Sequence, residues 1–162
     1  MSAVLSTDLS EAPEWKPLRE EDLARVAAIE AGVYVFPWSV GNFRDSLFAG
    51  YECTGCWVRG ELVAYAIVMS ALDEAHILNI AVASEWQGRG IGSLFMRWLI
   101  ESARKRALEM MYLEVRPSNR PVIQLYESLG FEPVGVRRGY YQAVGGREDA
   151  MALRLGLRDL GG

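Results

Sequence analysis

Hydrophobic residues recur along this chain at two spacings, and each spacing predicts a different kind of element. A helical spacing predicts amphipathic helices over residues 21–32 and from residue 91 onward. The second of these stripes is the longer one and contains Ile91, Leu94, Phe95, Trp98 and Leu99. Short apolar runs bounded by turn residues predict strands over residues 15–19, 52–58, 62–71, 76–82, 111–115, 131–136 and 150–155.

Turn and capping residues indicate where these elements begin and end. Ser39 is a good N-cap for a helix that stops near Gly50. The Arg59–Gly60 pair predicts a hairpin turn between the second and third strands. Pro121 fits the first turn of another short helix, and Gly130 suits the residue just past its end.

The order of these elements predicts one mixed α/β domain over residues 14–157. A β-hairpin half comes first and a βαβαββ arrangement follows, in which residues 137–149 join the last two strands. Residues 1–13 and 158–162 are predicted to be tails outside this domain. No internal repeat and no linker divides the sequence between them.

Composition narrows the classes of function. The chain has 162 residues and a formal net charge of −4 at pH 7, so there is no overall basic field to hold a nucleic-acid backbone. No apolar run approaches the ~20 residues that span a bilayer, and the acidic, polar start of the chain has no signal-peptide core. We therefore expect a cytosolic enzyme or binding protein that contacts neither membrane nor nucleic acid directly. The oligomeric state stays open.

The two cysteines form one isolated C-x-x-C pair, Cys53 and Cys56, and the chain has a single histidine, His76. Tetrahedral zinc needs about four ligands, so this set is too small, and we expect no metal. The pair also falls in a predicted strand, where residues three apart point to opposite faces. We interpret both as ordinary thiols.

The most informative segment joins a strand to the long helix. The strand ends with Asn79-Ile80-Ala81-Val82, and the helix opens with the stretch Gln87-Gly88-Arg89-Gly90-Ile91-Gly92-Ser93. Helix N-termini present unbonded N–H groups and a partial positive charge, glycines let a phosphate approach the backbone, and the arginine adds a charged donor. The segment is therefore typical of a diphosphate site, and the alternative is a glycine-rich turn without a ligand.

Two familiar phosphate motifs do not fit this segment. A P-loop needs a lysine after its last glycine, and here Ser93 follows Gly92 directly. The dinucleotide fingerprint G-x-G-x-x-G fails by one position, because the spacing of Gly88, Gly90 and Gly92 is G-x-G-x-G.

The Q-G-R-G-I-G stretch resembles the [QR]-x-x-G-x-[GA] coenzyme A signature of the GCN5-related N-acetyltransferase superfamily, and the similarity covers residues 15–155. More narrowly, the chain is similar to the bacterial ribosomal-protein alanine N-acetyltransferases. That likeness depends on six stretches in family order, which are FPWS (36–39), NIAV (79–82), LEVRPSN (113–119), LYESLGF (125–131), RRGYY (137–141) and GREDA (146–150). The resemblance implies the superfamily's fold, a central, strongly twisted mixed sheet with helices on both faces. It also implies acetyl-CoA as cosubstrate and binding of that molecule by the 87–93 stretch.

Acetyl transfer needs a neutral amine, and Glu114 is the candidate general base. It interrupts an apolar strand, where burying a carboxylate is costly unless it is paired or useful. From the residues alone, an outward-facing glutamate or one paired with Arg116 is an equal alternative. The resemblance implies the base. An α-amine has a pKa of ~7.7–8.0 and a lysine ~10.4, so an N-terminal acceptor needs only a modest base.

Tyr126 is the candidate acid, because a phenol can protonate a departing thiolate. Taken alone, it reads as a core aromatic at helical spacing with Val122 and Leu129. The resemblance implies that it protonates the coenzyme A sulfur and that Asn119 contacts the pantetheine arm. The alternative for Asn119 is a turn residue or helix cap.

The resemblance also implies that the backbone N–H groups of Ile80, Ala81 and Val82 polarise the thioester. Two sets of loop aromatics are expected to shape the groove for the peptide N-terminus, with core plugs as an equal alternative. These residues are Phe36, Pro37, Trp38, Tyr140 and Tyr141.

With these residues in place, the resemblance implies transfer of acetyl from acetyl-CoA to a protein N-terminal α-amine, with alanine of a small-subunit ribosomal protein as the acceptor. No cysteine occupies a motif position, so we expect direct attack in a ternary complex and no acyl-enzyme. Two alternatives are an acetyltransferase for a lysine side chain or a small amine, and a noncatalytic acyl-CoA-binding module.

Overall fold

The computed structural model describes residues 12–158, so most of the two predicted tails, 1–13 and 158–162, lies outside the described residues. The chain divides into two compact units. Within the described residues, the first unit comprises 12–68 and 79–96, and the second comprises 69–78 and 97–158. Each unit is described by itself below.

Within residues 12–158, seven strands form one sheet in the order β1-β2-β3-β4-β5-β7-β6. The strands are β1 (Glu14–Pro17), β2 (Glu52–Val58), β3 (Glu61–Ala71), β4 (Glu74–Val82), β5 (Met110–Val115), β6 (Glu132–Ala143) and β7 (Gly146–Gly156). β4 and β5 pair in parallel, whereas β2 with β3 and β7 with both β5 and β6 are antiparallel. This mixed sheet confirms the predicted fold class.

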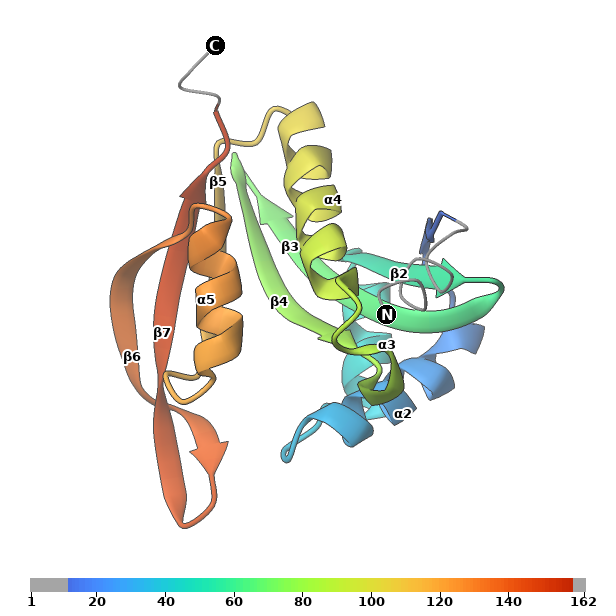
Figure 1. Cartoon of the computed structure of the whole chain (residues 1–162), viewed down its shortest axis with the longest axis horizontal. Coiled ribbons are helices and arrows are strands. Elements are labelled where there is room, and N and C mark those ends of the chain that lie inside the picture. The colour runs from blue at the N-terminus through green and yellow to red at the C-terminus, as the bar shows by residue number, and fades with distance from the viewer. Residues whose placement is uncertain (1–11, 159–162) are drawn as a thin grey trace, which may run out of the picture. The chain divides into compact units, whose positions relative to one another are not determined.

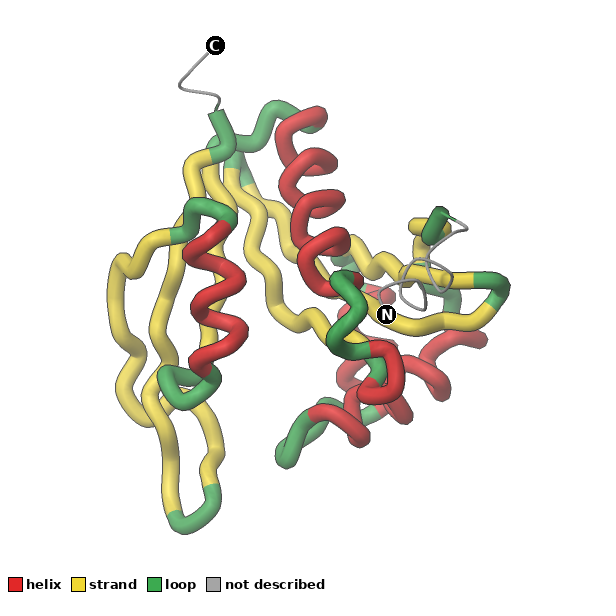
Figure 2. The backbone as a smooth tube through the Cα atoms, in the orientation of Figure 1, coloured by secondary structure: helices red, strands yellow, loops and turns green. Residues whose placement is uncertain are grey.

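Four α-helices and two 3₁₀ turns connect the strands in the described part of the chain (Figure 1; Figure 2). They are η1 (Glu20–Asp22), α2 (Leu23–Val33), α3 (Val40–Phe48), η2 (Ser84–Trp86), α4 (Ile91–Lys105) and α5 (Arg120–Ser128). All four predicted helices are therefore confirmed. None of the helices within residues 12–158 is long and apolar enough to cross a membrane.

In the first unit, the predicted turn and capping residues lie at the ends of their strands and helices. The β2–β3 turn places Arg59 and Gly60 at φ 51° and 82°, the left-handed pair that suits a tight hairpin. The Ser39 hydroxyl accepts the Asn42 N–H at 3.1 Å, and the Asn42 carboxamide oxygen accepts the Ser39 N–H at 2.9 Å. The capping prediction for α3 is confirmed, and α2 and α3 bury Val26, Ile29 and Phe43 in the core.

The two cysteines lie in β2, buried and free of any disulfide. Burial raises the pKa of the Cys53 thiol to about 11 and that of Cys56 to about 12. Both are therefore neutral thiols at physiological pH, poorly suited to nucleophilic chemistry, as the sequence indicated. Within residues 12–158, no group of three or more His, Cys, Asp and Glu side chains is arranged to hold a metal ion.

In the second unit, β5 lies between β4 and β7. It pairs in parallel with β4 from Glu74↔Met110 to Ile77↔Leu113, and antiparallel with β7 from Met110↔Gly156 to Val115↔Met151. Its alternate residues Met111, Leu113 and Val115 are buried, so Tyr112 and Glu114 share the opposite face. The side chain of the candidate base is thereby directed away from the buried face of its strand.

The closing hairpin is longer than predicted. Residues 137–149, expected as a connection, belong mostly to β6 and β7, with pairs such as Arg137↔Ala150 and Tyr141↔Glu148 (Figure 1). The register shifts between Arg137 and Tyr141, where the Gly139 N–H donates to Asp149 Oδ1 at 2.8 Å. Both faces of this part are largely exposed, so its sequence shows no alternation of apolar and polar residues to reveal strands.

Gly130 ends α5 in a conformation that other residues rarely adopt, with φ at 104°. A Cβ there would also lie 3.1 Å from Leu155 Cδ1. We expect Gly130→Ala to lower the free energy of unfolding by about 1–2 kcal/mol, measured by urea denaturation.

Gly135→Ala is the matched control, because a Cβ at Gly135 meets nothing within 4 Å. It should change the free energy of unfolding by less than about 0.5 kcal/mol. Equal losses in the two variants would show that the left-handed backbone at Gly130 does not carry the effect.

Candidate active site

The glycine segment follows the end of β4 in the first unit. The Ala83 N–H donates to the Val63 carbonyl at 2.8 Å, which fixes the chain as it leaves the strand. The side-chain amide of Gln87 donates back to the Val82 carbonyl at 3.0 Å and closes the loop. The segment predicted to hold the cofactor is therefore one continuous, braced turn between β4 and α4 (Figure 2).

The backbone of this turn fits the approach of a large anion. Gly88 and Gly90 have φ of 79° and 84°, and a Cβ at either one would meet nothing within 4 Å. The helix ladder starts with the Leu94 N–H donating to the Gly90 carbonyl at 3.1 Å. The amides of Ile91, Gly92 and Ser93 thus precede the ladder, at the positive end of a 15-residue helix.

The Arg89 side chain is held at the same turn. Its guanidinium carbon lies 4.7 Å from the centre of the Trp86 ring, and its Nη2 donates to the Glu85 carbonyl at 3.3 Å. A charged donor thereby lies beside the glycine backbone. These features suit a diphosphate ligand, and the binding roles of residues 87–93 stay a prediction.

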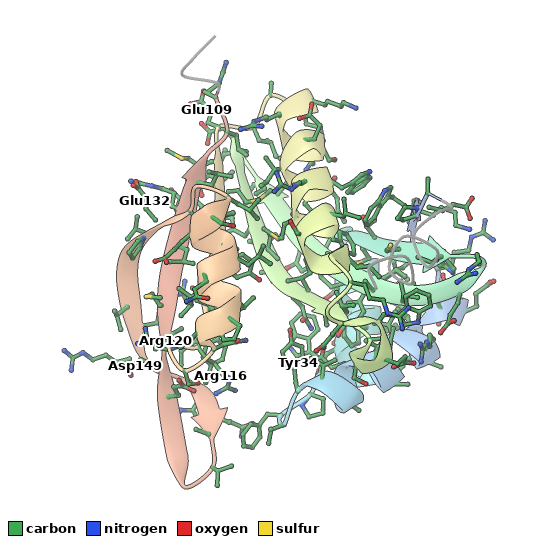
Figure 3. All side chains as sticks on the ribbon, in the orientation of Figure 1. Tyr34, Glu109, Arg116, Arg120, Glu132 and Asp149 are labelled. Atoms are coloured by element: carbon green, nitrogen blue, oxygen red, sulfur yellow. The ribbon has the colours of Figure 1, made fainter. Side chains whose placement is uncertain are left out.

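The strand residues before the turn are tied to α2. The Tyr34 hydroxyl, at the end of α2, donates to the Ile80 carbonyl at 2.6 Å (Figure 3). Ala81 is buried, whereas Ile80 and Val82 are partly exposed. The roles of the N–H groups of these three residues toward a thioester also stay a prediction.

Glu114 lies in a charged and aromatic cluster in the second unit. Its carboxylate is 26% exposed and pairs with Arg137 of β6, with 2.6 Å between Oε2 and Nε. The Arg137 guanidinium carbon lies 5.3 Å from the centre of the Tyr140 ring. The partner of Glu114 is therefore Arg137 and not Arg116, the one suggested by the sequence.

The charge of Glu114 affects the pKa of two nearby tyrosines, Tyr140 and Tyr141. Burial, followed by the negative charge of Glu114, raises the pKa of Tyr140 and also that of Tyr141. The two rings contact each other edge to face, with centroids 5.0 Å apart. The predicted base and these two predicted substrate residues are thus brought close together in the second unit.

Tyr126 lies on α5 and is 6% exposed. Burial raises the pKa of its phenol to about 12, and its ring lies 5.8 Å from that of Phe131. A phenol with such a pKa stays protonated at physiological pH, which suits a proton donor. Tyr126 also contributes to raising the pKa of Tyr141, so the two hydroxyls lie within electrostatic range.

The loop between β5 and α5 is fixed by Glu148 of β7. One carboxylate oxygen accepts the Ser118 N–H at 3.0 Å and the other accepts Arg116 Nη1 at 3.2 Å. The pKa of Glu148 is lowered by the hydrogen bond from the Ser118 side chain first, and then by those from the Ser118 N–H and from Arg116. Arg116 lies near the start of α5 (Figure 3). Asn119 is the N-cap residue of α5 and is exposed, with no capping bond from its side chain to a described residue. The Asn119 side chain therefore does not cap α5. Its contact with a pantetheine arm stays a prediction.

The loop aromatics of the first unit divide into two kinds. Phe36 is 38% exposed and Pro37 is exposed, as a recognition surface requires. Trp38 is only partly exposed, and its ring lies 5.2 Å from that of the buried Phe43. Trp38 therefore contributes to the core as well as to the loop.

Sequence reasoning missed two residues, one in each unit. Arg137 lies within the RRGYY stretch, and nothing in its local pattern points to Glu114, two strands away in the sheet. Glu30 lies within the helix predicted over residues 21–32, and no role was predicted for it. It is 2% exposed, and its position on the apolar stripe with Leu23 and Val26 was the available signal for a functional carboxylate.

Comparisons with known proteins bear on the family and the fold of this chain. A model described as the acetyltransferase (GNAT) family matches residues 18–131. The [ribosomal protein bS18]-alanine N-acetyltransferase of Escherichia coli strain K12 is 39% identical over 138 residues, which cover 85% of this chain and 93% of that protein.

Solved structures show the same likeness. The crystal structure of the ribosomal-protein-S18-alanine N-acetyltransferase from Escherichia coli has a TM-score of 0.86 and 37% identity, and the match covers 91% of this chain and 95% of that one. A putative acetyltransferase from Salmonella typhimurium, solved with its cofactor acetyl-CoA, has a TM-score of 0.72 and 19% identity over 94% of this chain and 98% of that one. The second likeness is one of fold.

Proposed function

This chain belongs to the acetyltransferase (GNAT) family and is an acetyl-CoA-dependent N-acetyltransferase. We propose that its acceptor is a protein N-terminal α-amine, that of the alanine of ribosomal protein bS18. The observation that carries this proposal is the similarity, over 85% of this chain, to an enzyme named for that substrate. Ribosomal proteins are made and assembled in the cytoplasm, so the proposal includes that location.

Residues of the first unit fit acetyl-CoA. Open space over Gly88 and Gly90, the amides of Ile91 to Ser93 and the guanidinium of Arg89 supply the shape and charge that a diphosphate needs. When bound, acetyl-CoA supplies an activated acetyl thioester. The domain proposed over residues 14–157 contains all of these groups.

Glu114 acts as the general base. Its carboxylate accepts a proton from the α-ammonium of the acceptor, directly or through one water. The exposed Arg137 holds the carboxylate in one orientation before the acceptor arrives. A modest base is sufficient, since roughly a tenth of an α-amine is already neutral at pH 7.

Tyr126 acts as the general acid. As the acceptor nitrogen forms its bond to the acetyl carbon and the carbon–sulfur bond breaks, the phenol gives its proton to the sulfur. The nitrogen releases its second proton to water, which leaves a neutral amide. Glu114 then returns its proton to solvent and Tyr126 takes one up, so acetylation of the α-ammonium releases one proton overall. The raised pKa of Tyr126 makes it reclaim its proton readily.

The substrate assignment is tested with two peptides. The first starts with Ala and copies the N-terminus of bS18, and the second is the same peptide with a blocked N-terminus and an added lysine. With acetyl-CoA, mass spectrometry should show one acetyl group on the first peptide, at its N-terminus, and kcat/KM at least 100-fold lower for the second.

Acetylation of the blocked peptide at its lysine, with equal or greater kcat/KM, would contradict the α-amine proposal and favour the lysine alternative. Binding of acetyl-CoA without turnover of any peptide or small amine would favour the noncatalytic module.

The catalytic roles are tested with Glu114→Gln and Tyr126→Phe. Loss of a general acid or base costs about 10²–10⁴-fold in rate, so each variant should lower kcat by at least 100-fold while the Kd for acetyl-CoA changes less than twofold. With wild type, kcat/KM should rise through the pKa of the acceptor amine near ~8 and stay level to pH ~10, because the pKa of Tyr126 is about 12.

Matched controls come from the same unit. Glu132→Gln removes a carboxylate that pairs with Arg154 at 3.6 Å, and Tyr112→Phe removes the hydroxyl of a tyrosine that stacks on His76. Both should keep kcat within about twofold. Losses of similar size in control and test variants would contradict the assignment of Glu114 and Tyr126.

A further inference from the structure

We propose that Glu30 is a positioning residue that holds the acceptor-binding loop, residues 34–39, to the strand end of β4 in the first unit. The inference rests on the proposed peptide acceptor and adds to it a residue outside the catalytic pair. Glu30 lies near the end of α2 and is 2% exposed, so its carboxylate is almost wholly removed from solvent.

Three donors converge on this one carboxylate. Oε2 accepts the backbone N–H of Trp38 at 3.0 Å, and Oε1 accepts the side-chain amide of Asn79 at 2.9 Å and the hydroxyl of Tyr65. Tyr65 is fully buried and Asn79 is 9% exposed. The Trp38 N–H carries no acceptor atom, so Glu30 can act toward it only as an acceptor.

These bonds join segments that are far apart in the sequence. Trp38 belongs to the loop between α2 and α3, Tyr65 to β3, and Asn79 to β4 immediately before Ile80. The Tyr34 hydroxyl makes a second link between the same two segments, to the Ile80 carbonyl (Figure 3). The Trp38 ring packs on Phe43, whose ring in turn lies 5.4 Å from that of Tyr65.

Stability alone is a weak reason for such a group. Hydrogen bonds between these donors and Glu30 add little net free energy of unfolding, because the same groups are hydrogen-bonded to water in the unfolded chain. What the carboxylate provides is geometry, because two oxygens fix the Trp38 amide and Asn79 at set positions. Phe36 and Pro37 are then presented from a loop whose conformation is formed before the acceptor binds, which reduces the entropy lost on binding.

Glu30→Gln tests the inference with almost no change in shape. Glutamine has one acceptor oxygen where glutamate has two. Either the Trp38 N–H then faces an NH₂ group and loses its acceptor, or Asn79 and Tyr65 face it and must turn their own acceptor atoms toward it, so the link between the loop and β4 changes in both cases. We expect the KM for the Ala-starting peptide to rise about tenfold, while kcat and the Kd for acetyl-CoA change less than twofold. In the NMR spectrum, hydrogen exchange of the Trp38 amide should be at least tenfold faster than in wild type.

Tyr65→Phe separates positioning from stability. It removes a donor to Glu30 but leaves the bonds to Trp38 and Asn79, so it should lower the free energy of unfolding while the peptide KM stays within about twofold of wild type. Glu20→Gln is the surface control, since that glutamate pairs with Arg44 in an exposed ion pair. It should change neither quantity.

The inference is overturned if Glu30→Gln raises the peptide KM no more than Tyr65→Phe does. It is overturned equally if the Trp38 amide of the wild type exchanges as fast as a solvent-exposed amide, a measurement that needs no variant to fold. Absence of peptide acetylation by the wild type would instead contradict the proposed function, and the exchange of Trp38 would still decide whether Glu30 holds the loop.

Discussion

The proposed binding of acetyl-CoA depends on the backbone N–H groups at the start of α4. The first turn of any helix has more donors than the helix can satisfy, and here that turn follows two glycines in left-handed conformations. Side chains at Gly88 and Gly90 would both strain the backbone and fill the open space in front of it. Gln87 and Arg89 are held by carbonyls of the same turn, so the loop is shaped without a ligand.

Two carboxylates illustrate how surroundings decide what a glutamate does. Glu30 is enclosed and accepts hydrogen bonds from groups that cannot move far, which suits a role in holding structure. Glu114 is partly exposed and pairs with the long, exposed side chain of Arg137, a partner that can swing away. A base has to exchange protons with an acceptor and with solvent, and only the second environment permits this.

Much of the fold was predictable, because its signals are local. Ser39, the Arg59–Gly60 turn, Pro121 and Gly130 set the ends of their elements as capping and turn chemistry require. The lengths of β6 and β7 in the closing hairpin were predicted too short. Both faces of this hairpin are exposed and hydrogen bonds such as that from the Gly139 N–H to Asp149 hold it, so apolar and polar residues do not alternate in its sequence. The ion pair of Glu114 with Arg137 depends on a strand order, β5-β7-β6, that no local pattern encodes.

Calorimetric titration of acetyl-CoA into the wild type, Gly90→Ala and Gly60→Ala tests whether the backbone at the start of α4 holds the diphosphate. Gly90 and Gly60 have φ of 84° and 82°, and a Cβ on either meets nothing within 4 Å, so the two substitutions strain the backbone alike. We expect Gly90→Ala to weaken binding at least tenfold and Gly60→Ala to leave it unchanged. Equal affinity in all three proteins, or no heat of binding in the wild type, would contradict this expectation.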